Sequence, residues 1–149
     1  MADFIETCIT LALPVVGVWW IVIRRRRAHR RDAMLAAEWS HALALSQSSN
    51  ASLVQVARVY QRARTGTKVH IRWANGVLQD AWLEDYAAAN GAWILATGDV
   101  GYGEHNKNPR VFRVWYGNLH MTLPAGAPAA YTRHLKRVAR QAARHRVAA

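Results

Sequence analysis

An uncharged segment that ends at a block of arginines constrains this chain more than any other sequence feature. Residues 7–23 (TCITLALPVVGVWWIVI) carry no charge, and six arginines lie within the next eight residues. With Phe4, Ile5 and Glu6 the segment reaches 20 residues. Because a helix rises about 1.5 Å per residue, it would be about 30 Å long, close to the thickness of a bilayer core. The segment therefore predicts a transmembrane anchor over residues 1–23.

Aromatic and basic residues at the end of this segment predict its orientation. Trp19 and Trp20 lie where an interfacial aromatic belt is expected, and the arginines that would set the topology follow them: Arg24, Arg25, Arg26, Arg27, Arg30 and Arg31. The positive-inside rule then predicts a single-pass protein of the inner (cell) membrane, with the N-terminus outside and the rest of the chain cytoplasmic. A cleaved signal peptide is disfavoured by the acidic Asp3 and Glu6, and a buried soluble helix by the cost of burying unpaired arginines.

The charge of the chain predicts anionic partners. Of 149 residues, 20 are Lys or Arg and 9 are Asp or Glu, which gives a net charge of +11. Membrane lipid, nucleic acid and an acidic protein partner all fit such a charge. Cys8 is the only cysteine, so neither a disulfide framework nor a thiolate metal site is expected.

Apolar periodicity divides the rest of the chain into three parts. Residues 24–65 are predicted as a basic helical juxtamembrane region, with Leu35, Trp39 and Leu43 at helical spacing and a second helix over 51–64. Residues 66–124 are predicted as a small antiparallel β domain of four or five strands, which could be barrel-like. Its strongest signals are the alternation over 68–73, the hairpin dipeptide Asn75-Gly76, and strand patterns over 77–83, 92–97, 111–116 and 119–123.

Residues 125–149 are predicted to form a basic amphipathic helix. Its apolar stripe comprises Tyr131, Leu135, Val138 and Ala142, and the arginines expected to contact an anionic partner follow two residues later: Arg133, Arg137, Arg140 and Arg144. Since two residues turn a helix by about 200°, the basic stripe is expected opposite the apolar one, which would dock on the sheet. The predicted fold class is α+β: a single transmembrane helix, juxtamembrane helices, a small antiparallel sheet and this basic C-terminal helix.

The sequence contains no recognised catalytic, cofactor-binding or metal-binding motif, and we expect no catalytic residue, cofactor or metal. The nearest candidates are Asp99, Glu104 and His105 in the Gly-rich loop 98–110, whose spacing matches no ligand set. A second acidic group comprises Asp80, Glu84 and Asp85, and the strand histidines His70 and His120 are expected to be structural.

Three functions remain open from the sequence. The first is a membrane-anchored, non-enzymatic adaptor that contacts anionic lipid and a protein partner or a second copy of itself. The second is a membrane-associated nucleic-acid-handling protein of a mobile element, and the third is an enzyme that uses the loop 98–110. Arginine outnumbers lysine 17 to 3, as is typical of high-GC bacteria such as actinobacteria. The layout resembles that of small membrane proteins encoded by conjugative plasmids or phages of such bacteria, which implies a role in plasmid transfer or spread.

Overall fold

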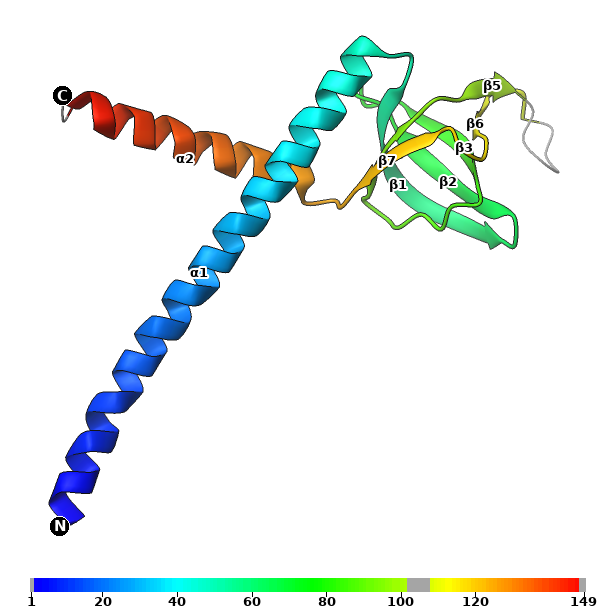
Figure 1. Cartoon of the computed structure of the whole chain (residues 1–149). Helices are drawn as coiled ribbons and strands as arrows, with labels where there is room; N and C mark the ends of the chain where they lie inside the picture. The colour runs from blue at the N-terminus through cyan, green and yellow to red at the C-terminus, as the bar shows by residue number, and fades with distance from the viewer. Residues whose placement is uncertain (1, 102–107, 148–149) are drawn as a thin grey trace.

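Two long helices and a curled, half-barrel sheet of seven strands make up the described chain (Figure 1). The computed structural model describes the backbone of residues 2–101 and 108–147 and the side chains of residues 19–101 and 108–146. Helix α1 (Ala2–Ser48) comes first and helix α2 (Ala127–Val147) last. Between them lie β1 (Ser52–Ala63), β2 (Gly66–Arg72), β3 (Leu78–Glu84), β4 (Trp93–Ala96), β5 (Asp99–Gly101), β6 (Val111–Val114) and β7 (Leu119–Leu123). The predicted α+β class is confirmed.

The predicted transmembrane anchor is not confirmed. Within the described residues, no helix combines the length and the apolarity that a membrane crossing requires. Five apolar residues lie from Trp19, where the described side chains of α1 begin, to Ile23, and a crossing needs about 20. The part of the predicted segment at residues 7–18 lies outside the described side chains. The predicted single-pass membrane topology and inner-membrane localisation are therefore wrong by this finding.

The sheet is larger than predicted and is mixed. Its strand order is β5-β6-β3-β2-β1-β4-β7, and every neighbouring pair is antiparallel except β3 and β6, which run parallel. The predicted hairpin at Asn75-Gly76 is confirmed, since it joins β2 to β3 and Gly76 has a positive φ of 83° that glycine adopts without strain. The prediction of four or five antiparallel strands is wrong because β1 and β5 add two strands and β6 pairs in parallel.

Strand β1 replaces the helix predicted over residues 51–64. Val54 and Val56 are fully buried, and the strand pairs with β2 on one side and β4 on the other. Register shifts between Val56 and Arg58 and between Val59 and Gln61 interrupt the alternation of apolar and polar residues. The local pattern therefore matches a helix, while pairing on both sides decides for a strand.

The two faces of the sheet build two separate hydrophobic cores. The inner face carries the larger one, in which Val54, Val69, Ile71, Leu83 and other residues are buried. On the outer face, α1 covers the β4–β7 end, where the ring of Trp39 meets that of Trp93 edge-on at 4.9 Å between centroids. The outer face of β2 and β3 stays uncovered by the helices and carries polar side chains.

Helix α2 crosses α1 next to the sheet and then runs away from it (Figure 1). Ala36 of α1 and Ala130 of α2 are both buried, and such small side chains let the two helices approach closely. Leu135 and Val138 are about half exposed, at 48% and 47%, so the apolar side of α2 does not dock on the sheet as expected. The reason is electrostatic, because Asp32 of α1 binds Arg133 and Arg137 on the other side of α2.

Candidate nucleic-acid interface

The positive charge of the protein is concentrated in the two crossing helices. Residues 24–48 of α1 contain six arginines and two acids, Asp32 and Glu38. Helix α2 contains six Lys or Arg residues and no acid. Residues 24–48 and α2 together therefore carry a net charge of +10, whereas residues 49–126, with eight Lys or Arg and five Asp or Glu, carry +3.

Asp32 holds the two helices together. One of its carboxylate oxygens accepts a hydrogen bond from Nη2 of Arg133 at 2.9 Å. The other accepts from Nε of Arg133 at 3.2 Å and from Nη2 of Arg137 at 2.6 Å. Asp32 is only 9% exposed, while the side chains of Arg133 and Arg137 are 54% and 32% exposed. This arrangement is the forked recognition that arginine offers a carboxylate.

The arginines shift the pKa of Asp32 well below its ordinary value of 3.8. The hydrogen bond from Arg133 is the largest cause, the hydrogen bond from Arg137 and the charges of both arginines add to it, and burial opposes it. The carboxylate is therefore ionised throughout the physiological pH range, and the crossing is held by a charged pair rather than by apolar packing alone.

This shift predicts how the helix crossing depends on pH. Because the folded pKa of Asp32 is depressed, its contribution is fully present above the unfolded value near 3.8 and is lost as the pH falls below it. We expect the difference in melting temperature between the protein and Asp32→Asn, followed by far-UV circular dichroism, to stay constant from about pH 7 to pH 5. The difference should shrink below about pH 4. A difference that already vanishes near pH 6 would contradict the assignment.

A cleft of about 440 Å³ opens between the helices, on the side of the crossing that lies toward the N-terminus of α1 and the C-terminus of α2. Helix α1 lines it with His29 and Ala33, and α2 lines it with His134, Arg137, Val138, Arg140, Gln141 and Arg144. No carboxylate is among these lining residues of the described chain. Arg140 and Arg144 are exposed and have no hydrogen-bond or ion-pair partner within the described residues.

The predicted site residues separate into three groups. Arg140 and Arg144 face the cleft, Arg137 lies in its wall while bound to Asp32, and Arg133 is bound to Asp32 outside the cleft. Trp19 and Trp20 are 66% and 57% exposed, and the guanidinium of Arg24 lies 5.0 Å from the ring centroid of Trp20. The remaining arginines are exposed on α1: Arg25, Arg26, Arg27, Arg30 and Arg31.

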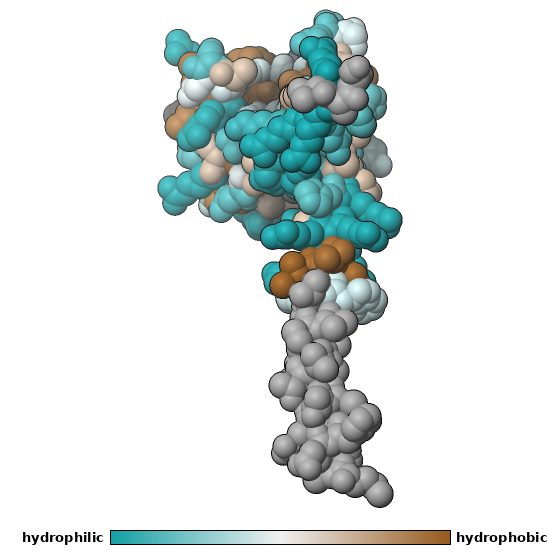
Figure 2. Space-filling model, turned by 90° about the vertical axis from the view of Figure 1, so that its left-hand side faces the viewer, coloured by the Kyte–Doolittle hydropathy of each residue, from teal (hydrophilic) through white to brown (hydrophobic). Residues whose placement is uncertain are grey.

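The hydropathy of the face toward which α2 projects agrees with the charge distribution of the two helices. Figure 2 shows the side toward which α2 projects, and it is mostly hydrophilic over the upper body. A hydrophobic band lies below that body. Ile21 and Val22, near the start of the described side chains of α1, are exposed apolar residues. The arginines that follow form a basic zone next to that band.

Asp32 is a site residue that was not among those predicted from the sequence. Its signal is present in the sequence, since Asp32 directly follows the arginine block and lies four and seven residues before Ala36 and Trp39, on one face of a helix. An acid on the apolar stripe of a basic helix indicates a buried ion pair, but the sequence does not show which arginines it binds.

The other candidate side chains serve local contacts. His70 and Asp80 form a pair at 2.8 Å, His120 lies 2.8 Å from the hydroxyl of Thr97, and a Glu84 carboxylate oxygen accepts from the backbone N–H of Tyr116. Asp85 is exposed after β3, and Asp99 is exposed on β5. Glu104 and His105 lie outside the described residues, and within residues 2–101 and 108–147 no three His, Cys, Asp or Glu residues converge to hold a metal ion.

Comparison with protein-family models, with curated proteins and with solved structures finds no match to this chain.

Proposed function

We propose that this protein binds nucleic acid through the phosphate backbone, with the cleft between α1 and α2 as the contact surface. The observation that supports this proposal most is the cleft itself. It is lined by Arg140 and Arg144, which have no partner within the described residues, and by no described carboxylate. Neutralising phosphates with such side chains releases condensed counterions, which favours binding.

The spacing of the cleft arginines suits a phosphate backbone. Arg140 and Arg144 are four residues apart, which is about 6 Å along a helix. Phosphates of one strand follow at about 3.4 Å along a duplex axis, so two nucleotides span nearly the same length. Contacts of this kind fix position without reading the base sequence, so we propose binding that is independent of sequence.

The electrostatic environment of the cleft also favours a strong polyanion over a weakly charged protein surface. The arginines of α1 continue the basic surface beyond the cleft, and residues 24–48 and α2 together contain twelve Lys or Arg residues and two acids. A field of this sign speeds the approach of an anionic polymer.

The full chain should bind a fluorescently labelled 25-base-pair duplex of arbitrary sequence in an anisotropy titration. With at least three phosphates neutralised, log K should fall with log salt with a slope of about −2.7 or steeper between 50 and 200 mM salt. A second duplex of unrelated sequence should bind with the same affinity. Absence of binding at 50 mM salt, or equal affinity for polyglutamate of the same length, would overturn the proposal.

A further inference from the structure

The two helices contribute different kinds of side chain to the cleft between them. Helix α2 lines the cleft with three arginines and with His134. Helix α1 carries six arginines, yet the residues that it contributes to the described lining are Ala33 and His29. A positive charge on the α1 wall of the cleft therefore depends on an imidazole.

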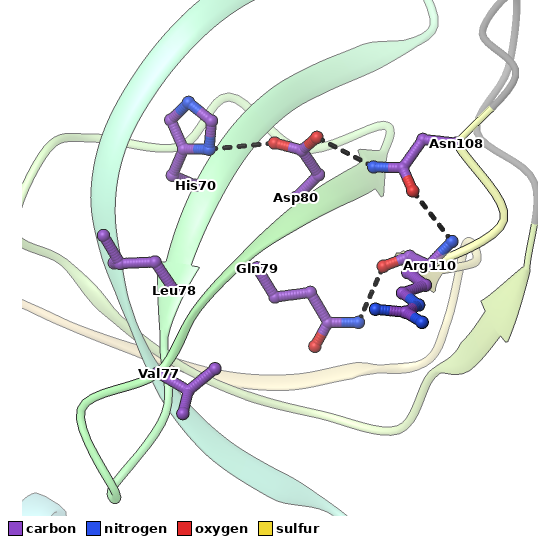
Figure 3. A pocket seen from close by; sticks show the side chains of 7 residues that line it. All are labelled: His70, Val77, Leu78, Gln79, Asp80, Asn108 and Arg110. Carbon is purple, nitrogen blue, oxygen red and sulfur yellow. Dashed lines mark hydrogen bonds and ion pairs between the residues drawn. The ribbon is translucent and has the colours of Figure 1, made fainter.

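Both imidazoles are available to a ligand. His29 is exposed and His134 is half-buried, and neither has a hydrogen-bond or ion-pair partner within residues 19–101 and 108–146. His70 on the sheet differs, because its Nδ1 lies 2.8 Å from a carboxylate oxygen of Asp80, which also accepts from the amide of Asn108 (Figure 3). An anion near His70 would meet that carboxylate, whereas an anion in the cleft meets no carboxylate of the described lining.

Charged and titratable side chains flank the cleft imidazoles on both helices. Three or four positions from one of the imidazoles, or in the cleft lining, lie Arg25, Arg26 and Asp32 of α1 and Tyr131, Arg137, Arg140 and Arg144 of α2. Asp32 is the one acid of this set, and Arg133 and Arg137 already bind it. A proton added to either imidazole therefore adds a positive charge that an external anion can neutralise.

Protonation of the cleft is coupled to the binding of a phosphate. Histidine is the side chain that ordinarily changes its charge between pH 5 and pH 8. A phosphate beside an imidazole favours the protonated form, in which both ring nitrogens donate hydrogen bonds. By reciprocity, protonation must favour the phosphate to the same extent.

We propose that His29 and His134 are phosphate-binding residues of the cleft that act in the protonated form, so that both helices contact the nucleic acid. The inference rests on the nucleic-acid function proposed above. The helix crossing persists over the pH range concerned, because the contribution of Asp32 is retained at every pH above about 4. A change in affinity between pH 8.5 and pH 5.5 thus reports on the imidazoles and not on loss of the cleft.

Anisotropy titrations of the full chain with the 25-base-pair duplex, at 0.1 M salt and at pH 8.5, 7.5, 6.5 and 5.5, test the proposal. With one further phosphate contact for each imidazolium, binding should tighten about 60-fold from pH 8.5 to pH 5.5, and the salt slope should steepen by about 1.8. His29→Gln with His134→Gln should remove most of this gain and leave the affinity at pH 8.5 unchanged. The control is His41→Gln with His120→Gln, which replaces two exposed histidines outside the cleft lining and should keep the gain.

Proton uptake gives a second readout. Calorimetric titration at pH 6.5 in buffers of different ionisation enthalpy should show net uptake of protons on duplex binding, and the cleft double variant should lose most of it. An affinity that stays constant from pH 8.5 to pH 5.5, or that rises equally in this variant, would overturn the proposal while the nucleic-acid function stands. Absence of duplex binding at all four pH values would overturn both.

Discussion

Replacing both Arg140 and Arg144 by glutamine should weaken duplex binding about 60-fold at 0.1 M salt. Each phosphate contact contributes about 0.9 to the slope of log K against log salt, so the loss of two contacts lowers log K by about 1.8 at 0.1 M relative to 1 M salt. The slope itself should become less steep by about 1.8. Both side chains are exposed at the cleft and bind no described residue, so their loss should leave the fold intact. Anisotropy titrations between 50 and 200 mM salt measure both quantities, and circular dichroism checks the helix content.

The matched control is Arg64→Gln with Arg72→Gln. These two arginines are exposed on the sheet, and replacing them lowers the net charge by the same two units. A small change in affinity and slope is expected there if position matters. Equal losses in both double variants would mean that the duplex responds only to total charge, which contradicts an interface at the cleft.

Replacing Asp32 by alanine should release α2 from α1. The change leaves Arg137, whose side chain is 32% exposed, facing a partly buried site without its carboxylate, and it removes three charge-assisted hydrogen bonds. Breaking a fully buried pair costs about 3–5 kcal/mol, and partial exposure of the arginines reduces the expected cost to about 2 kcal/mol. Because helix stability in proteins comes mostly from tertiary packing, the basic helix α2 should unfold as it detaches. Its amides should exchange hydrogen about 30-fold faster, measured by mass spectrometry of peptides from residues 127–147.

Glu38→Ala provides the comparison for this variant. Glu38 is an exposed acid on the same helix and makes no described ion pair, so its replacement changes the charge equally without touching the crossing. Exchange in α2 should remain as in the unmodified protein. Unchanged α2 exchange in Asp32→Ala would show that apolar packing alone holds the helices.

The membrane-anchor prediction shows how far a one-dimensional pattern can mislead. Residues 7–23 are uncharged, yet no helix among the described residues is long and apolar enough to cross a membrane. Helix α1 continues without a break to Ser48 and carries the residues that meet the sheet and α2. Among the described residues, α1 therefore acts as a long support for the crossing.

Local patterns determined those parts of the protein that neighbouring residues decide. The Asn75-Gly76 turn, the alternation that gives β2 and the helical spacing that gives α2 are visible in the sequence because each depends on residues only a few positions apart. The excess of arginine is also visible in the sequence, and the expectation of an anionic partner follows from it.

Tertiary structure decided which arginines are available. Arg133, Arg137, Arg140 and Arg144 are equivalent in sequence, yet Asp32, about a hundred residues away along the chain, binds the first two and leaves the last two at the cleft. In the same way, pairing on both sides made residues 52–63 a strand, and the β2–β3 register placed His70 beside Asp80. Periodicity gives the direction of each side chain around its own helix or strand, but only packing between distant segments determines what that side chain meets.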